Sequence, residues 1–227
     1  MSDIFDEVDE DLRADRTKAL LQRYGWLLAV AAVLVIVAAG AWQGWKYYET
    51  EETARLAKLY TAAMRDADAA SVPGAPTDAR DMAVANFTKV AAEAGPGYRT
   101  VARLRAAALA AEGGKRDEAL ALWDQVAADT AADPLLRDVA ALHFGLSLLD
   151  TPQLDAGAVS RIEAHLKPLL NPTNKLRPLA DEGLGLLALR QGNPAAAREI
   201  FKRLASDGNS PQGVRGRANG VLAQLGS

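Results

Sequence analysis

Two stretches decide the fold of this chain, GKRDEALALW at residues 114–123 and GNPAAAREIF at residues 192–201. In both, a glycine is followed five positions later by alanine, and four positions after that by a large aromatic residue. A small residue allows two helices to approach closely, and a large residue one turn further on fills the space beside the next helix. The pattern therefore predicts paired helices that stack on further pairs.

The same small-to-large spacing recurs along the chain at an even interval. Its evenly spaced copies are Ala119 and Trp123, Ala158 and Ile162, and Ala197 and Phe201, and an earlier copy, Ala83 and Phe87, lies slightly closer to the first of them. The same repeat frame also carries, on the first helix of each pair, Ala102, Ala141 and Ala180, followed by Leu109, Leu148 and Leu187. Helix pairs that contact only their neighbours build a solenoid.

The chain from residue 46 onward has the composition of helices and turns. Alanine, the best helix former, is abundant there, and β-branched or aromatic runs of strand length are missing. Proline and glycine gather in short clusters, such as residues 72–76, 95–97 and 192–194, which separate segments of helical length. We therefore expect an all-α chain whose solenoid of about four helix pairs ends in a capping helix from Pro211 to Leu225.

Upstream of the repeats, residues 26–45 form an apolar run that holds no charged side chain. As a helix rising about 1.5 Å per residue, this run spans the ~30 Å hydrocarbon core of a bilayer. Amphipathic rings prefer the headgroup layer, and they border the run at both ends as Tyr24, Trp26, Trp42, Trp45, Tyr47 and Tyr48. These aromatic residues are the expected membrane-interface anchors of a single N-terminal transmembrane helix.

A cleaved secretory signal is the alternative for this run, because the small residues at positions 39–41 fit a cleavage site. A signal peptide begins with a short basic region, whereas residues 1–23 hold seven acids and four bases. The apolar run also continues past the cleavage site to Trp45. We therefore favour an uncut anchor.

Charge beside the anchor predicts its direction. Four bases precede the apolar run and three follow it closely, which favours a cytoplasmic N-terminus and an exported C-terminal part. The expected layout is an acidic cytoplasmic tail at residues 1–23, a transmembrane anchor at 24–45, a stalk and first repeat helix at 46–76, and the helical repeat domain at 77–227.

The acidic tail leaves two interpretations open. Phe5, Val8 and Leu12 share one face of a short helix, as in a docking helix for a cytoplasmic partner. A solvated and mostly disordered tail, which keeps the N-terminus out of the bilayer, has the same composition.

The repeat motifs resemble the tetratricopeptide signature at its turn and second helix. Gly114, Ala119 and Trp123 stand at the matching positions, although the interval between copies is longer than the usual one and Gln153 replaces the glycine of the third copy. With the acidic tail, the aromatic-bordered anchor and a degenerate tetratricopeptide-like repeat, the whole architecture resembles the YfgM family. That resemblance implies a single-pass protein of the bacterial inner membrane, with its N-terminus cytoplasmic and its repeat domain periplasmic.

The resemblance also implies a function. A member of that family is a non-enzymatic, membrane-tethered protein-binding module, ancillary to the Sec translocon, that assists exported proteins as a periplasmic chaperone. Its partners are translocon components, exported client proteins and a membrane-anchored periplasmic chaperone. The alternative is a scaffold for a stable envelope complex, such as the cell-division or outer-membrane assembly machinery.

Self-association through the anchor is a further hypothesis. Gly40 and Gly44 form a small-xxx-small pair, which allows two membrane helices to approach closely. The same spacing also arises by chance on a face that contacts lipid, and the sequence leaves both interpretations open.

The sequence offers no catalytic, cofactor-binding or metal-ligating group. The chain has no cysteine and no phosphate-binding glycine loop, and its two histidines, His143 and His165, lie too far apart for a local metal-ligand pair. His165 falls at the repeat position of Val126 and Leu204, which predicts a packed, hydrogen-bonded histidine. After the tail, 22 bases balance 22 acids, so we expect no nucleic-acid partner.

A small basic group lies on one of the first helices. Arg99 and Arg103 share a helix face at i, i+4 spacing, with Arg105 beside them. This group is either a patch for acidic segments or lipid headgroups, or a solvated face paired with nearby acids such as Glu93 and Glu112.

Overall fold

The computed structural model describes the backbone of residues 3–72, 74–76 and 78–226, and the side chains of residues 30–31, 33–48, 50–72, 74–76 and 78–226. Helices and turns make up this backbone and no strand occurs in it, so the all-α prediction is confirmed for the part described. The chain divides into two compact units, Met1–Arg55 and Leu56–Ser227.

The first helix, α1, runs from Asp3 to Ala70, and its residues 56–70 belong to the second unit. The acidic tail is helical in its backbone from Asp3 onward, while the side chains of its predicted docking face lie outside the described residues. A search of the described residues found no helix with a stretch long and apolar enough to cross a membrane. The anchor predicted at residues 24–45 stays a prediction.

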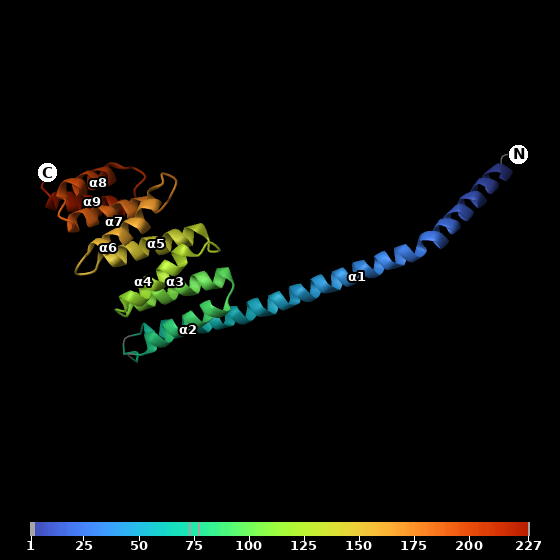
Figure 1. The fold of residues 1–227 in the computed structure, drawn as a ribbon, viewed down its shortest axis with the longest axis horizontal. Coiled ribbons are helices and arrows are strands. Elements are labelled where there is room, and N and C mark those ends of the chain that lie inside the picture. Colours follow the sequence, from blue (N-terminus) through green and yellow to red (C-terminus); the bar gives the residue numbers. More distant parts are fainter. Residues whose placement is uncertain (1–2, 73, 77, 227) are drawn as a thin grey trace. The chain divides into compact units, whose positions relative to one another are not determined.

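The second unit consists of helix pairs that are joined by short turns and stacked in chain order (Figure 1). The helices after α1 are α2 (Ala79–Glu93), α3 (Pro96–Glu112), α4 (Arg116–Ala128), α5 (Pro134–Leu149), α6 (Ala156–Leu166) with the short 3₁₀ helix η1 (Lys167–Leu170), α7 (Arg177–Arg190), α8 (Pro194–Ser206) and α9 (Gln212–Gln224). The end of α1 pairs with α2, where the rings of Tyr60 and Phe87 meet edge to face, and the next pairs are α3–α4, α5–α6 and α7–α8. The last helix, α9, packs on α8 and α7 where a capping helix was expected.

The turn glycines of the two motifs have the same backbone conformation. Gly114 and Gly192 have φ of 76° and 72°, in the left-handed region that residues with a Cβ rarely adopt. Each lies in a three-residue turn between the helices of a pair. Gln153, at the corresponding place of the third pair, lies in a six-residue turn between α5 and α6 and therefore needs no positive φ.

Side-chain caps fix where several helices begin. Asp133 accepts a hydrogen bond from the backbone N–H of Leu135 at 2.8 Å, and Asn193 accepts one from Ala196 at 3.0 Å. In both helices a proline occupies the first position, where a missing N–H costs nothing. These local signals set the lengths of the turns and hence the register of the pairs.

The small-to-large pairs lie in the core of the stack. The large members are at most 5% exposed, and they are Phe87, Trp123, Ile162 and Phe201. Their small partners Ala83, Ala119 and Ala197 are fully buried, whereas Ala158 in the first turn of α6 is half-buried.

One first-helix position differs from the repeat frame. Ala140 is fully buried, while the expected Ala141 is only half-buried. The reason is that Pro134 begins α5 one position earlier in the frame than Pro96 begins α3. The buried face of α5 therefore falls one residue early.

Glycines on the first helices make room for the large side chains of the second helices. A Cβ added at Gly185 of α7 would lie 2.9 Å from Cζ of Phe201, and one added at Gly145 of α5 would lie 2.6 Å from Cδ2 of Leu166. Carbon atoms do not approach this closely, so the close packing of α5 on α6 and of α7 on α8 depends on glycine at these points.

Ion pairs between exposed arginines and buried carboxylates attach the last helices to the stack. Glu182 of α7 is 9% exposed and accepts hydrogen bonds from Nε and Nη2 of Arg217 of α9, at 2.5 and 2.7 Å. Its neighbour Asp181 is 6% exposed and accepts one from Arg203 of α8 at 2.8 Å. The forked geometry suits a guanidinium facing a carboxylate, and it raises the pKa of Arg217.

Candidate protein-binding surface

The first helices of the last two pairs, α5 and α7, form the sides of a hollow of about 610 Å³. We call it the α5–α7 hollow. Its lining residues are Trp123 from α4, His143, Leu146, Ser147, Leu149 and Asp150 from α5 and its cap, and Leu186, Leu189 and Arg190 from α7. Volumes of this order are typical of sites that accept a ligand or a few side chains.

An aromatic pair forms one wall of the hollow. The rings of Trp123 and His143 stack with their centroids 5.5 Å apart and an interplanar angle of 16°. Trp123 is 5% exposed, so the repeat motif that builds the core also supplies this wall. The side chain of His143 is exposed in part, and its burial against the protein lowers its pKa, which favours the neutral imidazole.

The charged groups at the rim are engaged within the protein. Arg190 donates from Nη1 to the carbonyl of Leu149 at 2.7 Å and from Nη2 to the carbonyl of Pro152 at 2.9 Å. Its positive charge thus lies at the C-terminal end of α5, where the helix dipole is negative. Asp150 pairs with Arg116 at 3.3 Å, and its own side chain is 86% exposed.

Leucines supply most of the remaining lining. Leu146, Leu186 and Leu189 are half-buried in the free chain, so each has apolar surface that a partner could cover. Covering such surface contributes about 25 cal/mol per Å². This arrangement suits an apolar side chain of another polypeptide, because it combines leucine surface, an aromatic wall and a rim of paired charges.

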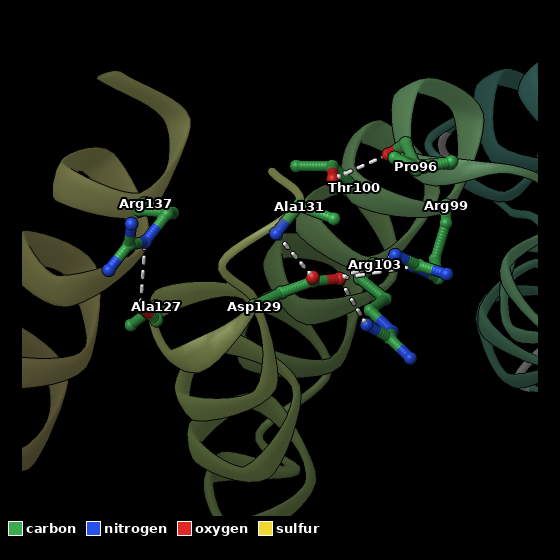
Figure 2. Close-up of polar contacts among 8 residues, drawn as sticks. All are labelled: Pro96, Arg99, Thr100, Arg103, Ala127, Asp129, Ala131 and Arg137. Atoms are coloured by element: carbon green, nitrogen blue, oxygen red, sulfur yellow. Dashed lines mark hydrogen bonds and ion pairs between the residues drawn. The ribbon is translucent and has the colours of Figure 1, made fainter. Parts of the chain in front are cut away.

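Two residues of the basic group predicted on α3, Arg99 and Arg103, bind one carboxylate (Figure 2). Asp129, in the turn after α4, accepts hydrogen bonds from Arg99 at 3.1 Å and from Arg103 at 3.3 Å, and its side chain is 15% exposed. Folding brings the α4–α5 turn against α3, so these two arginines share a carboxylate that lies far from them in the sequence. The same carboxylate also accepts from the backbone N–H of Ala131.

His165 is packed and hydrogen-bonded, as the repeat frame predicted. Its ring stacks on Phe144 at 3.8 Å, Nδ1 lies 2.9 Å from the carbonyl of Arg161, and Nε2 lies 3.0 Å from Asp124. Both ring nitrogens thus have partners in the protein. Within the described residues no group of three or more His, Cys, Asp or Glu residues is placed to hold a metal ion.

The predicted anchor residues are exposed wherever the structure describes them. Trp42, Trp45, Tyr47 and Tyr48 are 73%, 74%, 66% and 71% exposed. The side chains of Tyr24 and Trp26 lie outside the described residues. A Cβ added at Gly40 or Gly44 would meet nothing within 4 Å, so the first unit leaves this face open.

Sequence reasoning did not find the α5–α7 hollow. It proposed only the anchor residues as functional positions, because the degenerate repeat leaves the phase of each helix uncertain. One signal was present in the sequence, since His143, Leu146, Ser147 and Asp150 recur at helical spacing on one face of α5. The opposite side of the hollow required the packing of α7 on α5, which no local pattern gives.

Comparison with known proteins gives one family. Residues 18–218 match the family described as Tetratricopeptide repeat-like domain. No curated protein and no solved structure matches the chain. The family match spans all four helix pairs and also reaches upstream over residues 18–55. The chain therefore belongs to the tetratricopeptide repeat-like domain family.

Proposed function

We propose that this protein is a membrane-tethered protein-binding module, ancillary to the bacterial Sec translocon, that assists exported chains as a periplasmic chaperone. The observation that carries the binding function is the α5–α7 hollow, an open apolar surface on the first helices of a tetratricopeptide-like solenoid. Solenoids of this kind bind polypeptide segments along their helices and generally act as interaction scaffolds rather than catalysts.

The proposed tether rests on the exposed apolar part of α1. The aliphatic side chains from Val33 to Val37 are 59–69% exposed, and four aromatic rings follow them. A bilayer covers such a surface and accommodates the rings in its headgroup layer. In the proposed topology the N-terminus is cytoplasmic, residues 24–45 cross the inner membrane, and the repeats lie in the periplasm.

Tethering has a mechanistic consequence for a shallow binding surface. A domain confined close to the bilayer reaches an effective concentration on the order of millimolar toward partners in the same membrane. A hollow with weak intrinsic affinity then captures chains as they leave a translocon. Translocon components, exported clients and a membrane-anchored periplasmic chaperone are the partners that this proposal names.

Photocrosslinking in living cells tests the proposal. A crosslinking amino acid is placed at Ser147 in the hollow, at Tyr47 beside the proposed membrane exit, and at Met82 on α2 as a control outside the hollow. Met82 is 55% exposed and does not line the hollow. The adducts are identified by mass spectrometry with and without a block of protein synthesis.

The expected result is translocon components at Tyr47 and many exported chains at Ser147 that disappear when synthesis stops. A single stoichiometric partner that persists through the block would contradict the chaperone function and support the scaffold of a stable envelope complex. Adducts formed equally at Met82 and Ser147 would contradict the role of the hollow.

A further inference from the structure

We infer that the α5–α7 hollow selects an uncharged apolar side chain, of leucine or phenylalanine type, presented by a peptide segment without acidic residues. The inference rests on the proposed protein-binding function and names the ligand class of its site. Three features of the hollow carry it: the apolar lining, the neutral aromatic wall and the arrangement of charge at the rim.

The lining contacts a ligand mainly through leucine side chains, and no charged group lies among these leucines to pair with a charged ligand. Leu146 faces the hollow from α5, and Leu186 and Leu189 face it from α7. Ser147 is the uncharged polar residue among them, and it is half-buried. A charged side chain placed here would lose hydration without gaining an ion pair, which is costly.

The aromatic wall adds shape without adding charge. His143 lies on Trp123 with an interplanar angle of 16°, and burial lowers its pKa, which favours the uncharged ring. The exposed surface of the His143 ring, which lies on Trp123, suits the edge of a phenylalanine or the branched end of a leucine. No cation is added at this wall for a ligand carboxylate to bind.

The rim opposes an anionic ligand. The helices α5 and α7 both end at the hollow, at Leu149 and Arg190, so the negative ends of two helix dipoles face it. The guanidinium of Arg190 offsets the first of these through its bonds to two backbone carbonyls. Asp150 pairs with Arg116 at 3.3 Å and its side chain is 86% exposed, so the rim carries a carboxylate beside the position that a ligand carboxylate would take.

Charge complementarity therefore excludes the most obvious competing ligand, an acidic C-terminal peptide. Such a ligand requires cations whose donors point into the groove. Arg190, which lines the hollow, instead donates to two backbone carbonyls at and beyond the end of α5, and burial lowers the pKa of the wall residue His143. A second copy of this chain and an acidic peptide remain as outcomes of the test.

The test uses the full-length protein in nanodiscs and three fluorescent peptides of one length, measured by anisotropy. The first has leucine and phenylalanine at its centre with serine and asparagine flanks, the second has aspartates in the flanks, and the third ends in an acidic tail without apolar residues. The first peptide should bind most tightly. The second should bind at least fivefold more weakly than the first, and the third should not bind. Affinity of the first peptide should change little with salt.

Variants of the hollow keep the test falsifiable. Ser147→Trp fills the hollow and Leu186→Gln makes one side of it polar. Each variant should bind the first peptide at least tenfold more weakly than the wild type. Met82→Gln, at an exposed apolar side chain on α2, is the matched control and should leave binding unchanged. The unfolding midpoint of each variant, measured by circular dichroism, separates lost binding from lost folding.

The inference is overturned if the acidic peptides bind as tightly as the first, or if folded Ser147→Trp and Leu186→Gln proteins bind it normally. Binding that appears only together with dimers, seen by light scattering, would assign the hollow to a second copy and also overturn it. If the inference fails in one of these ways but exported chains still crosslink at Ser147, the proposed function is still supported. If the peptides bind in the expected order but no exported chain crosslinks in cells, the translocon role is contradicted and the ligand class is supported.

Discussion

The aliphatic residues 33–37 of α1 and those in the core of the helix pairs meet opposite surroundings. Side chains from Val33 to Val37 are 59–69% exposed, whereas Leu109, Ile162 and Leu187 are at most 2% exposed. The second unit covers its apolar surface with its own helices, while the described part of the first unit leaves such surface open. Open apolar surface costs about 25 cal/mol per Å² in water, so the two units differ in how much of this cost their own packing removes.

The largest effect is expected from a substitution in the core of the second unit. Phe201→Ala removes a fully buried ring beside Gly185 and should lower the free energy of unfolding by about 3–5 kcal/mol. Val35→Ala, at a side chain that is 67% exposed, should leave it unchanged. Urea unfolding followed by circular dichroism measures both. Equal shifts of the two midpoints would remove the contrast between the units.

A charge placed in α1 tests what covers its exposed surface. Leu34 is 63% exposed, and Leu34→Arg should cost about 2.5–3.5 kcal/mol if this residue lies near the centre of a bilayer. The fraction of protein that stays in the membrane pellet after alkaline extraction should then fall. Val72→Arg, at a similarly exposed valine after α1, is the control. Equal retention of both variants would argue against the proposed anchor.

Glycines separate close packing from open surface within the second unit. Gly185→Ala brings a Cβ to 2.9 Å from Phe201 and should destabilise the unit by about 1–3 kcal/mol through overpacking. Gly220→Ala on α9 meets nothing within 4 Å and should stabilise that helix by up to about 1 kcal/mol. Thermal midpoints of opposite sign are expected. A loss of stability in both variants would mean that α9 also packs through its glycine face.

The sequence predicted the repeat because its signals are local. The glycine turn at residue 114 and the spacing from Ala119 to Trp123 act within one helix pair, so they report on structure without long-range information. The capping helix followed from the same logic, since the turn before Pro211 and the apolar positions after it are contiguous.

Contacts between distant segments were not predictable in the same way. Asp129 is bound by Arg99 although the two are far apart in the chain, whereas the sequence suggested the nearer acids Glu93 and Glu112. The α5–α7 hollow depends on how α7 packs against α5, and the six-residue turn at Gln153 lies between them in the chain. A pattern read along one helix gives which face is buried but not which residue of another helix lies opposite.

A smaller effect tests the polar contacts of the second unit. Asp129→Asn removes the carboxylate that Arg99 and Arg103 share and should destabilise the unit by about 1 kcal/mol, because charge-assisted hydrogen bonds weaken with partial exposure. The exposed pair of Glu163 and Lys167 is the control, and Glu163→Gln should cost only about 0.3–0.5 kcal/mol. Added salt should reduce the stability loss caused by Glu163→Gln more than the loss caused by Asp129→Asn. If salt instead reduced the loss in Asp129→Asn more, the contact of Asp129 would behave as a surface ion pair.

The smallest expected effect sharpens the comparison at the α5–α7 hollow, where the second unit leaves apolar surface open. Burial lowers the pKa of His143 in the folded chain, so as pH falls below the ordinary value of about 6.5 the unfolded chain takes up a proton before the folded chain does. Wild-type stability should therefore decline through that interval relative to His143→Phe, which keeps a ring on Trp123 and cannot titrate. Above this pH interval the two stability curves should run parallel, because both chains are then neutral at this position.

Midpoints of urea unfolding between pH 7.5 and 5 on the two proteins measure the difference. The carboxylates are the same in both proteins, so their titration does not contribute to the difference. Parallel curves throughout would mean that the imidazole is solvated, and the neutral wall of the hollow would lose its support.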